Sequence, residues 1–166
     1  MYVYNDSSSQ TVYSVSKTNP SFPGSCVGGQ NFGQTQTVNA GQNVWAVASQ
    51  SSSFIESKGD CHVTTSVYAD PALTQLIATE ENAIALSILS SPDGSNNSIN
   101  WISHRDNPVD FCAPGWSCSV VRSDTNPRGF PSGYQHLHIH VNTTSGAAAS
   151  SKAPLNNVKP KTPAVH

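Results

Sequence analysis

Charge is scarce in this chain. Only 11% of its 166 residues are charged, with 8 Lys and Arg against 10 Asp and Glu, whereas about 25% is the usual share. The chain has no basic excess that would attract nucleic acid or an anionic membrane surface. Long apolar runs are also missing, and none approaches the roughly 20 residues that cross a bilayer. We therefore expect no nucleic-acid partner and no membrane span.

Uncharged polar residues take the place of charge, mainly Ser, Thr, Asn, Gln and Gly. Such a surface is common in secreted and cell-wall proteins, so we expect a secreted, extracellular protein. No secretory leader is visible, because Met1 is followed directly by the strand-like segment Tyr2–Asn5. We expect that Met1 stands where a removed leader ended.

The cysteines are few and even in number: Cys26, Cys61, Cys112 and Cys118. They form no paired Cys-x-x-Cys knuckles, which argues against a structural zinc site. Between Cys112 and Cys118 stands a Pro-Gly turn that would bring the two ends together. Of the three possible connectivities we expect Cys112–Cys118 and, by elimination, Cys26–Cys61, as in an extracellular protein.

Three Asn-x-Ser/Thr sequons point to the same compartment. Their acceptor residues are Asn5, Asn96 and Asn142. Because such sequons are glycosylated in secreted proteins, they predict a glycoprotein.

Short alternating stretches, separated by Gly, Pro and Asn, predict a mostly-β domain over residues 1–142. The candidate strands are 2–5, 11–16, 35–38, 43–48, 61–68, 84–88, 100–103, 118–122 and 134–142. The first two read as a hairpin joined by the polar run 6–10. We expect an antiparallel β-sandwich or barrel with at most one short helix.

That one helix would begin at Asp70 and Pro71. Asp is a favourable N-cap, and Pro suits the first position of a helix. Leu73, Leu76 and Ile77 then form a short apolar stripe. We expect the helix to end before Ala83.

A low-complexity tail follows the domain over residues 143–166, rich in Ser, Ala, Pro and Lys. Such a composition predicts a flexible segment. If the tail is ordered, we expect it to dock on an adjacent copy and to mediate self-association.

Three histidines recur at every second position in His136, His138 and His140, with apolar residues between them. Along a strand they would form a row of imidazoles on one face. Imidazole is the commonest metal ligand, but three in a line span about 13 Å, too far for one ion. A site for one copper or zinc ion would therefore use His138 with His136 or His140, plus a third ligand from elsewhere in the chain. The candidates for that ligand are His62, His104, Asp106 and Asp110. The alternative is that the row is polar filler and the protein holds no metal.

The row also resembles the His-x-His-x-His motif of histidine-triad nucleotide hydrolases and transferases. The match covers six residues only. The glycine-led phosphate-binding stretch of that family has no counterpart in Gly133-Tyr134-Gln135. We therefore carry no catalytic residue over from it.

Aromatic residues in the second half suggest a binding alternative. Trp101, Trp116 and Tyr134 lie near Gly- and Pro-rich loops. Exposed rings beside Asn, Asp and Gln suit stacking on carbohydrate, and Trp116 in the Cys112–Cys118 loop is the ring that we expect to be exposed. The alternative is that these rings fill the core.

No G-x-S-x-G elbow of a serine hydrolase occurs, and nothing fixes the separation of Asp106 and Asp110 or of Glu80 and Glu81 as a glycosidase pair would need.

The N-terminal third carries a family resemblance. Its motifs are Tyr2-Val3-Tyr4-Asn5-Asp6-Ser7, Val12-Tyr13-Ser14-Val15 and Asn39-Ala40-Gly41-Gln42. They resemble the opening of small secreted fungal proteins of the thaumatin-like kind, including the yeast-phase-specific proteins. The resemblance implies a β-sandwich, secretion and a role at the cell wall or host surface. The dense cysteine framework of true thaumatins is missing.

Three functions follow from these observations. The first is a secreted, non-enzymatic protein that binds a surface or an extracellular glycan. The second is a metal-binding protein or metalloenzyme built on the histidine row. The third is a structural subunit of an extracellular assembly, with the tail as connector.

Overall fold

The protein folds as an all-β sandwich. A computed structural model describes residues 1–19, 26–50, 61–88, 97–103, 109–123, 127–129 and 136–144. The strands in these ranges are β1 (Tyr2–Asn5), β2 (Val12–Thr18), β3 (Cys26–Gly28), β4 (Gln36–Val38), β5 (Asn43–Trp45), β6 (Ala48–Gln50), β7 (Cys61–Tyr68), β8 (Leu76–Ile88), β9 (Asn97–Ser103), β10 (Phe111–Cys112), β11 (Trp116–Ser123) and β12 (His136–Thr143). The described residues form no helix.

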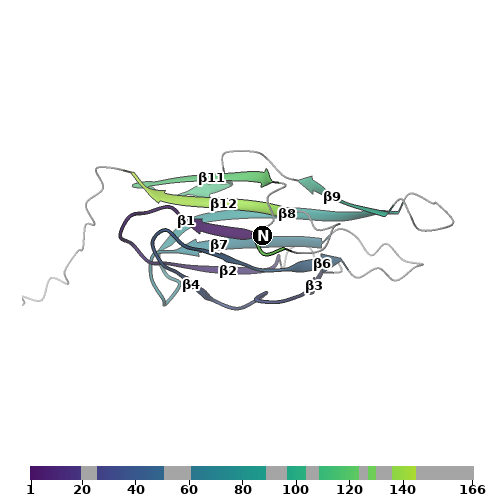
Figure 1. The fold of residues 1–166 in the computed structure, drawn as a ribbon, viewed down its shortest axis with the longest axis horizontal. Helices are drawn as coiled ribbons and strands as arrows, with labels where there is room; N and C mark the ends of the chain where they lie inside the picture. Colours follow the sequence, from purple (N-terminus) through teal and green to yellow (C-terminus); the bar gives the residue numbers. More distant parts are fainter. Residues whose placement is uncertain are drawn as a thin grey trace, which may run out of the picture.

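Two sheets form the layers of the sandwich (Figure 1). Sheet A has the strand order β11-β12-β1-β5, and sheet B the order β10-β8-β7-β2-β4 with β9 also paired to β8. A small third sheet pairs β3 with β6. The predicted mostly-β sandwich is therefore confirmed. Its strands pair in antiparallel fashion except for β1, which runs parallel to β12.

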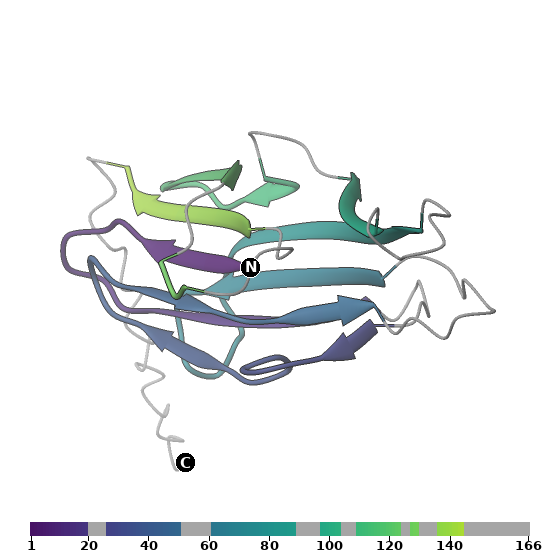
Figure 2. The ribbon, with the colours of Figure 1, turned by 45° about the vertical axis from the view of Figure 1, so that its right-hand side comes forward.

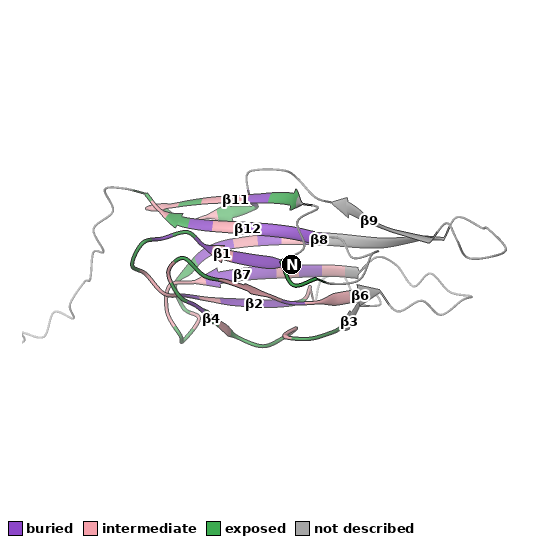
Figure 3. Cartoon of the chain, viewed as in Figure 1, coloured by how far each residue is buried: buried purple, intermediate pink, exposed green. Residues whose placement is uncertain are grey.

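The core consists of the apolar residues that face inward from the two sheets. Leu137, Ile139 and Val141 of β12 are at most 1% exposed, and Val63 and Val67 of β7 are fully buried. Each set occupies alternate positions of its strand, as the sequence predicts. Buried positions run along β12, β1, β7 and β2 (Figure 3).

The predicted hairpin of the first two strands is wrong. Strand β1 lies in sheet A between β12 and β5, whereas β2 lies in sheet B between β7 and β4. Asn5 fixes the point where the chain leaves sheet A. Its Nδ2 donates to the carbonyl oxygens of Gln10 at 2.6 Å and Val38 at 2.9 Å, and its Oδ1 accepts from the Ser7 hydroxyl at 2.6 Å.

The predicted helix from Asp70 is also wrong, because β8 begins at Leu76. Asp70 does cap backbone N–H groups, but those of a tight loop between β7 and β8. Its Oδ1 accepts from the N–H of Gln75 at 2.7 Å and of Thr74 at 3.0 Å. Desolvation opposes the effect of these bonds, yet they hold the pKa of Asp70 below its usual range. A capping residue is recognised from the local sequence alone, and here Asp70 stabilises the loop of a β-hairpin and not the start of a helix.

The predicted disulfide between Cys112 and Cys118 is confirmed. Pro114 and Gly115 form the turn, in which the Trp116 N–H donates to the Ala113 oxygen at 3.1 Å and Gly115 has φ 86°. A positive φ at the third position is the reason for glycine in such a turn. The side chains of Cys26 and Cys61 lie outside the described residues, so the second bridge stays a prediction.

Candidate functional site

The histidine row lies on the outer face of sheet A, as predicted, but not as an isolated row. Parallel pairing sets Tyr2 beside His138 and Tyr4 beside His140. The Tyr2 ring centroid lies 4.9 Å from that of His138 and 5.8 Å from that of His136. Tyr4 lies 5.1 Å from His138 and 4.5 Å from His140. The imidazoles and the two phenol rings therefore form one aromatic ladder across β1 and β12.

One end of this ladder is covered. Tyr2 is 1% exposed, and His138 and His136 are buried. Arg128 lies beside this end, with its guanidinium 5.9 Å from the centroid of the Trp45 ring. The short described segment 127–129 lies beside β1 (Figure 2). Burial raises the pKa of the Tyr2 and Tyr4 hydroxyls above their ordinary value, and Arg128 acts in the opposite direction on both.

The other end of the ladder is open to solvent. Tyr4 and His140 stack there with an interplanar angle of 7°. The Nδ1 of His140 lies 2.8 Å from the Oδ2 of Asp6, and the two side chains are 33% and 46% exposed. Asn43 faces Tyr4 from β5, and its buried Oδ1 accepts no hydrogen bond from the described residues. These four residues, Tyr4, Asp6, Asn43 and His140, are called the Tyr4–His140 patch below.

The predicted further metal ligands that the structure describes, His62 and Asp110, do not join the histidine row. His62 lies on the outer face of sheet B, where its Nδ1 is 3.2 Å from the Oε1 of Glu81. His62 alternates with the buried Val63 and so points away from the core, on the opposite side of the sandwich from the row. Asp110 also belongs to sheet B, because it is tied to β8, whereas His104 and Asp106 lie outside the described residues. Within the described part of the chain, no three His, Cys, Asp or Glu side chains gather as a metal site.

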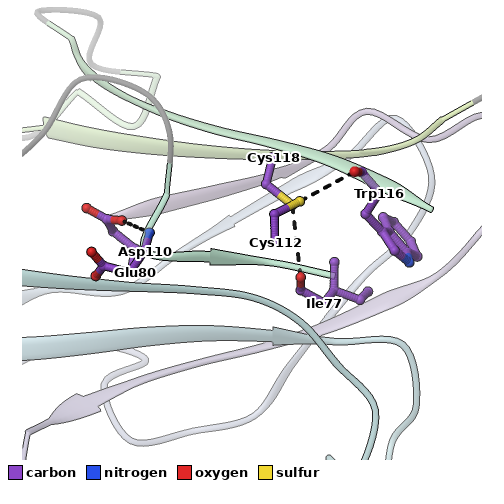
Figure 4. The surroundings of a disulfide bond; sticks show 6 residues. All are labelled: Ile77, Glu80, Asp110, Cys112, Trp116 and Cys118. Atoms are coloured by element: carbon purple, nitrogen blue, oxygen red, sulfur yellow. Dashed lines mark hydrogen bonds between the residues drawn. A yellow bond between two sulfur atoms is a disulfide. The ribbon is translucent and has the colours of Figure 1, made fainter. Parts of the chain in front are cut away.

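The acidic residues near the disulfide hold strands together. The Asp110 N–H donates to the Oε2 of Glu80 at 3.1 Å, and the Glu81 N–H donates to the Oδ2 of Asp110 at 2.7 Å. Figure 4 shows Glu80 and Asp110 side by side next to the Cys112–Cys118 bridge. These reciprocal bonds fasten the segment before β10 to the edge of β8. The carboxylates thus complete backbone pairing in this region.

Of the three predicted carbohydrate-binding aromatics, Trp116 is the one whose side chain the structure describes. Trp116 is partly buried and packs against the core beside the disulfide (Figure 4). The Trp101 side chain and Tyr134 lie outside the described residues. Sequence reasoning missed Tyr4 and Trp45 as surface aromatics. The signal was present, since Tyr2-Val3-Tyr4 alternates as the histidine row does.

The predicted glycosylation acceptors differ in their surroundings. Asn142 is exposed near the end of β12, and Asn96 lies outside the described residues. Asn5 is fully buried, and the nitrogen that would carry a glycan donates two hydrogen bonds. The folded domain therefore leaves no room for a glycan on Asn5.

The tail beyond residue 144, predicted to mediate self-association, lies outside the described residues. In the described part, no helix is long and apolar enough to cross a membrane.

No protein-family model, curated protein or solved structure matches this chain. The resemblance of its N-terminal third to thaumatin-like proteins therefore stays a prediction.

Proposed function

We propose that this is a secreted, non-enzymatic protein that binds an extracellular glycan through the Tyr4–His140 patch. One observation carries the proposal: the aromatic ladder is buried at one end and open where a stacked ring pair stands beside a carboxylate. The open pair offers a ring face and ring edges, and Asp6 offers acceptor oxygens. Sugar recognition uses this combination, because the apolar face of a pyranose packs on a ring while its hydroxyls form hydrogen bonds.

The patch is also rigid, which favours binding. Tyr4 is held between neighbouring strands by β12 on one side and β5 on the other. The backbone N–H of Asp6 donates to the Val141 oxygen at 2.9 Å, which fixes the start of the loop after β1. Groups that are already in place lose little conformational entropy when a ligand binds. A flat sheet face of this kind suits a glycan surface or chain better than a small buried ligand.

Replacing Tyr4 by Ala tests the proposal. We expect the variant to bind an insoluble polysaccharide panel of glucans, mannans and chitin about tenfold more weakly than the wild type, because an aromatic contact contributes on the order of 1 kcal/mol beyond its area. Binding is measured by depletion from solution and, for soluble oligomers, by calorimetry. Tyr68→Ala is the matched control, since Tyr68 is a half-buried tyrosine of sheet B.

Three results would contradict the proposal. The first is that the wild-type protein binds no member of the panel. The second is that Tyr4→Ala binds as well as the wild type, and the third is that Tyr68→Ala loses as much affinity as Tyr4→Ala.

A further inference from the structure

We infer that the glycan carries free amino groups, as a deacetylated amino-sugar polymer does, and that Asp6 binds its ammonium groups. This inference rests on the proposed function and names the class of ligand. It follows from the charged side chains on the outer face of sheet A and from the contacts that each of them makes within the protein.

Among the described residues of this face, Asp6 is the carboxylate, and one of its two oxygens is open to a ligand. Its Oδ2 is bonded to the Nδ1 of His140 at 2.8 Å. Its Oδ1 accepts no hydrogen bond from the described residues, and the side chain is 46% exposed. In the tautomer that carries the proton on Nδ1, His140 donates to the Oδ2 of Asp6 and orients the carboxylate. The Oδ1 of Asp6 is thus left to accept from a ligand at the open end of the ladder.

The other side chains on this face indicate the sign of the charge that the ligand carries. Next to His140 on β11 stands Ser119, and next to Tyr4 on β5 stands Asn43, so both neighbours are uncharged. The nearby cation, Arg128, lies over the Trp45 ring at the covered end. An anionic glycan would meet the Asp6 charge first and be repelled. A cationic sugar would gain a charge-assisted hydrogen bond from Asp6.

The aromatic rings favour the same ligand. An ammonium group within about 6 Å of a ring centroid is attracted to the ring face. Tyr4 is half-buried and stacks on His140 at 4.5 Å between ring centroids, and the Nδ1 of His140 lies 2.8 Å from the Oδ2 of Asp6, so Tyr4 and Asp6 flank the same imidazole and can act on one ligand. An amine on a sugar stacked at Tyr4 would therefore meet a ring and a carboxylate together.

The test compares three β-1,4-linked oligosaccharides of equal length: glucosamine, N-acetylglucosamine and glucose. By calorimetry at low salt we expect the wild type to bind the glucosamine oligomer about fivefold more tightly than the other two, the upper range for a partly exposed ion pair. Asp6→Asn should remove this preference, so that the variant binds the glucosamine oligomer no more tightly than the N-acetylglucosamine and glucose oligomers. Asp6→Glu should retain the preference, because it keeps the charge.

The matched control is Glu81→Gln. Glu81 forms the equivalent pair with a histidine, His62, on the outer face of sheet B. This variant should keep the preference. All proteins are made in a host without N-linked glycosylation, because Asp6→Asn creates the sequon Asn-Ser-Ser.

The outcomes separate the inference from the proposed function. Equal binding of the three oligomers by the wild type would overturn the inference and leave glycan binding standing. A preference that survives in Asp6→Asn, or that is lost in Glu81→Gln, would overturn the role of Asp6. Absence of binding to every oligomer and to the polysaccharide panel would overturn both.

Discussion

At the scale of single residues, the Asn5 side chain shows how one buried amide can be fully hydrogen-bonded. It is fully buried, and its amide makes bonds to Gln10, Val38 and Ser7. The bond to Val38 joins the end of β1 in sheet A to β4 in sheet B. Asn5 begins a glycosylation sequon in the sequence, but in the fold its side chain fixes the point where the chain passes from sheet A to sheet B.

We therefore expect Asn5→Ala to lower the free energy of unfolding by roughly 2–3 kcal/mol, because buried carbonyl groups lose their donor. The measurement is the midpoint of denaturant unfolding. Thr11→Ala is the control, since the Thr11 hydroxyl makes only an exposed, 3.4 Å bond to Asn39, and it should change stability by no more than about 0.5 kcal/mol. Equal effects of the two substitutions would argue against this role of Asn5.

At the scale of elements, the loop between β7 and β8 combines hydrogen bonds that close it with one strained backbone position. The Ala69 N–H donates to the Gln75 oxygen at 2.9 Å and closes the loop. Asp70 binds the backbone inside the loop, and Leu73 adopts φ 57°. A left-handed backbone at a leucine is unfavourable, and it is held here by the surrounding hydrogen bonds.

Leu73→Asn should raise the free energy of unfolding by about 1 kcal/mol, because Asn tolerates the left-handed region better than Leu does. Leu73→Ala keeps the unfavourable backbone and removes only the side chain, so it should not stabilise the protein. Both variants are compared with the wild type by thermal unfolding. A destabilised Leu73→Asn variant would indicate that contacts of the leucine side chain outweigh its backbone strain.

At the scale of the whole molecule, the Cys112–Cys118 bridge joins the two sheets. Cys112 belongs to β10 and pairs with Ala78 of sheet B, whereas Cys118 belongs to β11 and pairs with Val141 of sheet A. The Thr144 N–H also donates to the Gly115 oxygen of the intervening turn at 3.0 Å. The bridge, the turn and the end of β12 thus close one end of the sandwich.

Replacing Cys112 and Cys118 together by Ser should lower the free energy of unfolding by about 2 kcal/mol, the value for a closed loop this short. Denaturant unfolding of the variant without reductant gives the measurement. Ser117→Ala changes an exposed neighbour on β11 and serves as the control. An unchanged midpoint in the double variant would show that packing alone holds the sheets together at this end.

Local patterns predicted much of this fold. The alternation of Leu137, Ile139 and Val141 predicted the inner face of β12, and residues 61–68 were predicted as the strand that β7 forms. The Pro-Gly turn predicted the disulfide. These features depend on neighbouring residues alone, since alternation and turn geometry act over a few positions.

The sequence by itself determined several strands, among them β7 and β12, the apolar faces of these strands and that the histidines share one face, but it predicted a helix where β8 begins. Only the tertiary structure decided that β1 inserts in parallel beside β12, which brings Tyr4 to His140 across more than a hundred residues of chain. It also placed His62 on the opposite side of the sandwich and buried Asn5. Strand pairing is set by packing between distant segments, so no local pattern specifies it. The Tyr4–His140 patch exists because of that pairing.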